Sequence, residues 1–62
     1  MKIIAVDNFN RENISDRLVA SDVNQFEGKI MVEALNNRFA TNEDAPYYRL
    51  VENDHVLYRS DL

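Results

Sequence analysis

The stretch VNQFEGKIMVEALNNRF, residues 23–39, is the longest segment of the chain with a helical pattern of apolar residues. Its apolar side chains recur at intervals of three and four residues, which places them on one face of a helix. They are Val23, Phe26, Ile30, Met31, Ala34, Leu35 and Phe39. We therefore predict one long amphipathic helix from Asp22 to Phe39, against which the rest of the chain packs.

The start of this helix has two candidate caps. Asp22 forms a capping-box pattern with Gln25, and Ser21 forms the alternative with Asn24 one residue earlier. Gly28 lies inside the predicted helix, where a glycine costs about 1 kcal/mol relative to alanine. It indicates either a close approach by another element or a glycine that is tolerated near the N-terminal turns.

Length, composition and charge limit the class of protein. A chain of 62 residues forms a single domain, residues 1–62, that buries only about 60% of the surface of its unfolded chain. It has no cysteine, a single histidine and no apolar run of membrane-spanning length, so we expect a soluble cytoplasmic protein without disulfides or structural zinc. The net charge of −4 disfavours binding to nucleic acid or to a membrane.

Residues 2–6, KIIAV, are rich in β-branched side chains and followed by Asp7, which predicts a first strand. Because the apolar run from Ile3 to Val6 is unbroken, we expect the strand to be covered on both faces or to lie centrally in a sheet. Residues 40–46 are polar and end in Pro46, so the long helix is over by about Phe39.

The segment after the first strand allows two interpretations. In the first it is a helix from Arg11 to about Val19, with Asn10 as the N-cap and a hydrophobic staple between Phe9 and Ile14. In the second, residues 18–20 form the apolar part of a strand that pairs back on the first one. We predict the helix and keep the strand as the alternative.

The C-terminal part predicts a hairpin of residues 47–52 and 55–59, with a tight turn at Asn53-Asp54 or a loop from Glu52 to His55. Either connection pairs Val51 with Val56, Leu50 with Leu57, and Arg49 with Tyr58. One face of the hairpin then carries Tyr48, Leu50, Leu57 and Arg59, and the other carries Tyr47, Arg49, Val51, Val56 and Tyr58.

We predict from these elements an α+β fold of order β-α-α-β-β, in which a three-stranded antiparallel sheet packs on the long helix. The alternative order is β-β-α-β-β. The buried side of the sheet is expected to present Ile4, Val6, Leu50 and Leu57 to Phe26, Ile30, Ala34 and Leu35. Truncating Ile30 or Leu35 to alanine should then cost about 2–5 kcal/mol.

No combination of side chains indicates catalysis, a cofactor or a metal. We interpret His55 and Glu52 as a cross-strand charge pair beside the turn, not as a general base or a metal site. The serines Ser15, Ser21 and Ser60 have no base at a motif spacing, and a single glycine excludes a glycine-rich phosphate loop. We therefore expect no enzyme.

Five stretches carry a resemblance when taken in order: AVDNFNRE (5–12), LVASDV (18–23), VEALN (32–36), YYRLV (47–51) and VLYR (56–59). In this order they resemble a group of very short uncharacterised proteins of bacteria and their phages. The resemblance covers nearly the whole chain and brings no assigned chemistry. It implies a prokaryotic or phage accessory protein.

The apolar surface exceeds what so short a chain can cover, because the helix is apolar over more than half its turn and the hairpin on both faces. We therefore predict a small acidic interaction module, an accessory or inhibitory protein that binds a protein partner or forms a homodimer. The expected partner-binding residues, on one hairpin face, are Tyr47, Arg49, Val51, Val56 and Tyr58.

Two other functions fit parts of the sequence. A nucleic-acid-binding helix-turn-helix could form from residues 11–20 and 22–39, although acidic residues open its second helix. Acidic mimicry of DNA by an inhibitor fits the net charge and the size, but basic residues interrupt the acids along the chain.

Overall fold

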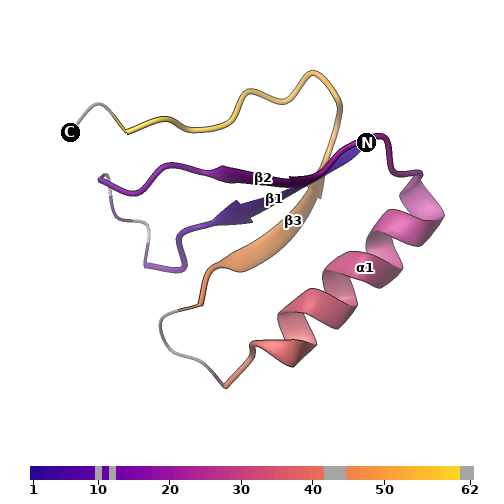
Figure 1. Cartoon of the computed structure of the whole chain (residues 1–62), viewed down its shortest axis with the longest axis horizontal. Coiled ribbons are helices and arrows are strands. Elements are labelled where there is room, and N and C mark those ends of the chain that lie inside the picture. Colours follow the sequence, from indigo (N-terminus) through magenta and orange to yellow (C-terminus); the bar gives the residue numbers. More distant parts are fainter. Residues whose placement is uncertain (10, 12, 42–44, 61–62) are drawn as a thin grey trace.

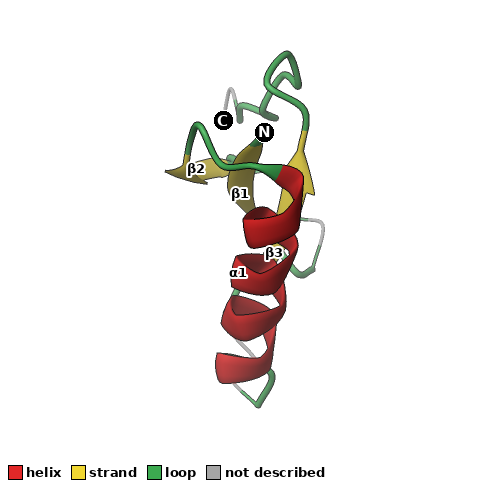
Figure 2. Ribbon diagram, turned by 90° about the vertical axis from the view of Figure 1, so that its right-hand side faces the viewer, coloured by secondary structure: helices red, strands yellow, loops and turns green. Residues whose placement is uncertain are grey.

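The computed structural model describes residues 1–9, 11, 13–41 and 45–60. Its elements are β1 (Lys2–Val6), β2 (Arg17–Ala20), α1 (Gln25–Arg38) and β3 (Tyr47–Val51). The strands form an antiparallel sheet in the order β2-β1-β3, and α1 packs on one face of it (Figures 1 and 2). The predicted α+β class with a three-stranded antiparallel sheet is therefore confirmed, and the observed order is β-β-α-β.

β2 lies where we predicted a helix from Arg11 to Val19, so that prediction is wrong. The strand pairs with β1, with Arg17 opposite Ala5 and Leu18 opposite Ile4. A helix of nine residues is marginal in water, whereas pairing with β1 satisfies backbone groups along a whole strand edge. The two residues of the expected staple are both exposed, and the expected N-cap, Asn10, lies outside the described residues.

α1 begins later than predicted, because Asn24 is its N-cap and not Asp22 or Ser21. The Asn24 Oδ1 accepts a hydrogen bond from the backbone N–H of Glu27 at 2.7 Å, and its Nδ2 donates to Glu27 Oε1 at 2.7 Å. Asp22 has φ 58°, in the left-handed region, whereas an N-cap residue requires an extended backbone. The helix ends at Arg38, with Phe39 as its C-cap.

The hydrophobic core lies between α1 and one face of the sheet. The register of β1 and β3 places Ile3 opposite Leu50, and Ala5 opposite Tyr48. Ile3, Ala5 and Tyr48 are buried, and the residues packed against them include Val32 and Leu35 of α1.

The predicted buried face is correct for Leu50 and Leu35 but wrong for β1, because Ile4 and Val6 point away from the helix. Ile3 to Val6 are all apolar, so their alternation does not select the face that meets the helix. The one signal is Lys2, which shares the outward face with Ile4 and Val6. The outward side of α1 is also apolar, with Phe26 76% exposed and Ile30 54% exposed. A helix that is apolar on both sides does not reveal which side is buried.

Gly28 is the point of closest approach between α1 and β3. A Cβ atom at this position would lie 2.6 Å from Leu50 Cδ1 and 3.2 Å from Leu50 Cδ2. Of the two explanations for this glycine, close approach by another element is therefore the one that holds.

The second strand of the predicted hairpin is not formed, and residues 55–59 do not pair with β3. The outer edge of β3 is occupied instead by Asn36 of α1. The backbone N–H of Tyr48 donates to Asn36 Oδ1 at 2.8 Å, and Asn36 Nδ2 donates to the Tyr48 carbonyl at 3.0 Å. A side-chain amide offers the same donor and acceptor as a peptide group, so Asn36 takes the place of a neighbouring strand there.

Residues 55–60, which we name the C-terminal segment, run alongside β2, and the sheet lies between this segment and α1 (Figure 1). The chain turns through a hydrogen bond from His55 N to the Glu52 carbonyl at 3.1 Å. Ile4 points toward the face of the sheet opposite α1 and is nevertheless 0% exposed. The molecule thus has three layers, namely α1, the sheet and the C-terminal segment. No helix within the described part of the chain is long and apolar enough to cross a membrane.

Candidate functional site

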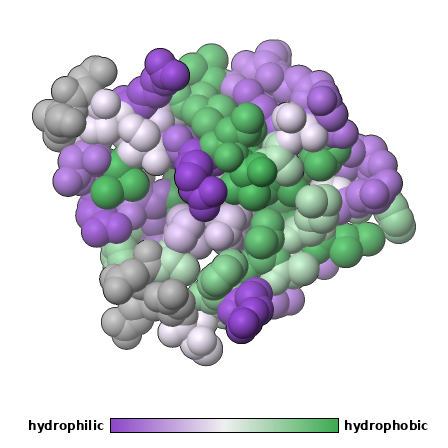
Figure 3. Space-filling model, viewed as in Figure 1, coloured by the Kyte–Doolittle hydropathy of each residue, from purple (hydrophilic) through white to green (hydrophobic). Residues whose placement is uncertain are grey.

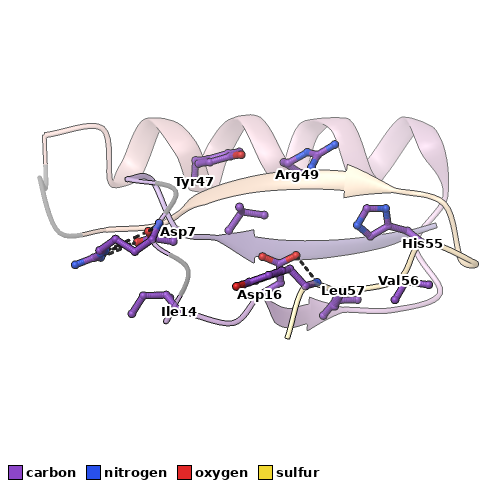
Figure 4. Close-up of a pocket in the computed structure, with 11 residues that line it drawn as sticks. Asp7, Ile14, Asp16, Tyr47, Arg49, His55, Val56 and Leu57 are labelled. Atoms are coloured by element: carbon purple, nitrogen blue, oxygen red, sulfur yellow. Dashed lines mark hydrogen bonds and ion pairs between the residues drawn. The ribbon is translucent and has the colours of Figure 1, made fainter. Parts of the chain in front are cut away.

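An open groove of about 600 Å³ lies between the sheet and the C-terminal segment, on the side opposite α1 (Figure 4). Side chains reach it from the end of β1, from the loop before β2, from β3 and from the C-terminal segment. The lining residues are Val6, Asp7, Arg11, Ile14, Asp16, Tyr47, Arg49, His55, Val56, Leu57 and Tyr58. Apolar, aromatic and charged groups thus share one surface. We name it the sheet groove.

A bidentate ion pair forms one end of the sheet groove. Arg11 Nη2 lies 2.6 Å from Asp7 Oδ1, and Arg11 Nε donates to both carboxylate oxygens at 3.1 Å. The backbone N–H of Arg11 donates to Asp7 Oδ2 at 2.6 Å, which closes the turn after β1. The Arg11 guanidinium also lies over the Phe9 ring, 5.3 Å from its centroid. Asp7 therefore fixes the loop that supplies Arg11 and Ile14 to the groove.

These contacts lower the pKa of Asp7 below its ordinary value of 3.8, chiefly through the hydrogen bonds from the Arg11 side chain and then from the Arg11 backbone. A carboxylate whose pKa is lower in the folded protein contributes stability above its unfolded pKa and loses that contribution as the pH falls through the folded value. We expect the melting temperature to fall on acidification below about pH 4. In Asp7→Asn the fall should be shallower.

Thermal unfolding followed by circular dichroism between about pH 7 and pH 2.5 measures this difference. Asp54→Asn is the matched control, because Asp54 is exposed beside the turn and makes no ion pair with the described residues. Curves of Asp7→Asn and the natural chain that run parallel over the whole range would contradict the role of Asp7.

The other wall of the groove is held by contacts between residues far apart in sequence. Asp16 N donates to the Tyr58 carbonyl at 2.9 Å, and Tyr58 N donates to Asp16 Oδ2 at 2.9 Å. Ser60 N donates to Ser15 Oγ at 2.8 Å. These bonds join the C-terminal segment to the residues before β2 and so define the width of the groove.

The five residues predicted to bind a partner are not all on the surface. Tyr47, Arg49, Val56 and Tyr58 line the sheet groove, and all four are exposed. Val51 is buried, at 5% exposure, and does not line the groove.

The hairpin that we predicted to bring the partner-binding residues together is not formed. Tyr47 and Arg49 come from one strand by simple alternation, whereas Val56 and Tyr58 arrive with the C-terminal segment. His55 lines the groove and forms no salt bridge with Glu52, so the predicted cross-strand charge pair is absent.

The sequence analysis did not identify Asp7, Arg11 and Asp16, which lie between β1 and β2, as residues of the groove. Asp7 and Arg11 are four residues apart, but this spacing predicts an ion pair only within a helix, and here the two residues lie in a turn after β1. Nothing local marks the contact between Asp16 and Tyr58, which are 42 residues apart.

Neither a metal cluster nor a known relative identifies this site. Among the described residues, no group of three or more His, Cys, Asp or Glu side chains is placed to hold a metal ion. A scan against protein-family models and searches of curated proteins and of solved structures find no match for the chain.

Proposed function

We propose that this protein is a small interaction module that binds an extended segment of a partner protein in the sheet groove. The observation that carries the proposal is the chemistry of the lining. Tyrosine and arginine are the residues most enriched at binding hot spots, and here Tyr47, Tyr58 and Arg49 lie in one groove (Figure 4). Val6, Ile14 and Leu57 supply the apolar contacts between them.

The charges of the groove favour an acidic residue in the bound segment. Asp7 is neutralised by Arg11, and Asp16 accepts a hydrogen bond from Tyr58 N. Arg49 has no carboxylate partner within the described part of the chain. A guanidinium offers two parallel donors to a carboxylate, so we propose that Arg49 receives an aspartate or glutamate flanked by apolar residues.

The groove is open along its length, which suits a chain segment better than an enclosed small molecule. The resemblance to short bacterial and phage proteins agrees with an accessory or inhibitory role. The nucleic-acid alternative loses its structural basis, because Arg17–Ala20 form a strand where the first helix of a helix-turn-helix was required.

Selection of peptides from a random library on the immobilised protein tests the proposal. We expect enriched peptides to carry an acidic residue next to apolar ones. Their affinity should fall about tenfold or more in Arg49→Glu, because attraction becomes repulsion. Arg38→Glu is the matched control, since it makes the same charge change on α1, on the other side of the sheet.

Chemical shifts of the protein with a selected peptide then locate the site. Changes should concentrate at Tyr47, Arg49, Leu57 and Tyr58. Peptides without acidic preference, equal affinity for Arg49→Glu, or shift changes confined to α1 would each refute binding in the sheet groove.

A further inference from the structure

The outward side of α1 carries an apolar line that no other part of the described structure covers. Phe26, Ile30 and Ala34 are spaced by four residues and therefore follow one another along the helix. Phe26 is 76% exposed, and Ile30 is 54% exposed. Apolar residues reach the surface over α1 in the space-filling view (Figure 3). The side chains that contact the sheet lie on the opposite side of the same helix.

Charged residues border this apolar line in a regular order. Glu27 and Arg38 are eleven residues apart, close to three full turns, and so share one flank of the line. Lys29 and Glu33 share the other flank, one turn apart. On the first flank the acidic residue precedes the basic one along the chain, and on the second flank the basic residue precedes the acidic one. None of these four residues forms a salt bridge within the described residues.

The total accessible surface is larger than a compact monomer of this mass requires. The chain exposes 4819 Å² and has a mass of 7.2 kDa. Folded monomers of that mass expose about 4,100 Å², so the excess is roughly 700 Å². A standard protein interface covers about 800 Å² on each partner. This excess is summed over the whole surface, including the open sheet groove, and is similar in size to one side of an interface.

We propose that α1 pairs with α1 of a second copy of the chain, antiparallel across a two-fold axis. In this arrangement each apolar line covers the other, and each flank faces the same flank of the second copy in reverse order. A two-fold axis near position 32 places Ile30 opposite Ala34 of the second copy. Glu27 and Arg38 of the second copy are then about 1.5 Å out of line along the helix, and Lys29 and Glu33 of the second copy about 3 Å, which these long side chains can span. The charge order of both flanks is thus complementary to itself, which favours a second copy over an unrelated helix.

This interface is independent of the sheet groove, because α1 and the C-terminal segment lie on opposite sides of the sheet (Figure 1). A dimer through α1 leaves both grooves open.

The oligomeric state over a concentration series tests the pairing. We expect sedimentation equilibrium to show a monomer–dimer equilibrium between about 10 μM and 1 mM. Ile30→Glu should abolish the dimer and leave a folded monomer, because Ile30 is not part of the core. Val56→Glu is the matched control. Val56 is 85% exposed but belongs to the C-terminal segment, so its dimer should be unchanged.

A charge exchange tests the antiparallel arrangement itself. Glu27→Lys and Arg38→Glu should each weaken the dimer about five- to tenfold, because each places like charges opposite one another twice. The double variant restores opposite charges and should recover the natural affinity to within about threefold. Far-UV circular dichroism of every variant checks that α1 is intact.

A monomer at all concentrations would overturn the proposal. So would a dimer that survives Ile30→Glu or is lost in Val56→Glu. A double variant as weak as the single ones would overturn the antiparallel pairing, and capture of a different protein's helix by a chain that stays monomeric would show that the occupant is not a second copy.

Discussion

Replacing Ile4 with alanine should lower the free energy of unfolding by about 2–5 kcal/mol. Ile4 is 0% exposed although it points away from α1, so its cavity would open between the sheet and the C-terminal segment. Domains of this size have a total stability of only about 5 kcal/mol. We therefore expect the variant to be largely unfolded at physiological temperature.

Urea denaturation followed by circular dichroism measures this loss. Ile30→Ala removes the same atoms from an exposed position of α1 and is the matched control. At protein concentrations below about 10 μM, where the chain is expected to be monomeric, Ile30→Ala should cost less than about 1 kcal/mol. This value replaces the larger loss that the sequence led us to expect. Equal losses at the two positions would show that the C-terminal segment does not cover the sheet.

Gly28→Val should also be strongly destabilising, by about 1–3 kcal/mol. The first added carbon would lie 2.6 Å from Leu50 Cδ1, so either α1 or the Leu50 side chain must move. Valine has a slightly higher helix propensity than glycine, by a few tenths of a kcal/mol, so the clash with Leu50 outweighs an intrinsic gain. The glycine is required by the close approach of β3.

A double-mutant cycle separates these causes. In the background of Leu50→Ala, the space next to Gly28 is vacated, so Gly28→Val should cost clearly less than in the natural chain. Thermal and urea denaturation of the four proteins supply the cycle. An equal cost in both backgrounds would show that the contact with Leu50 is not the cause.

The sequence predicted the elements whose local signals agree with their environment. KIIAV contains three β-branched residues in an apolar run, and as β1 it lies between two strands with Ile3, Ile4 and Ala5 buried. The central part of α1 and all of β3 fall within their predicted segments. Where two local signals competed, as at residues 11–19, pairing with β1 decided the outcome and overrode a plausible N-cap and staple.

The layout of the sheet groove could not be predicted, because long-range contacts build it. Asn36 closes the outer edge of β3, where we expected residues 55–59 to pair. Residues 55–59 run alongside β2 instead, and Tyr58 bonds to Asp16. An asparagine inside a helix and an aspartate inside a loop are common residues, so neither one signals these roles locally.

The central position of β1 also sets the order of events in folding. β1 is the first strand to be synthesised, yet its partner β3 lies more than forty residues later in the chain. Loops of that length must close before the long-range contacts form, so we expect slower folding than in a helical domain of the same size. On the ribosome, β1 remains half-paired until β3 has emerged, and Ile4 stays uncovered until residues 55–60 follow. During this interval the nascent chain exposes an apolar strand with an unpaired edge, which is prone to aggregation. We therefore expect a chaperone that shields apolar segments to raise the yield of folded protein.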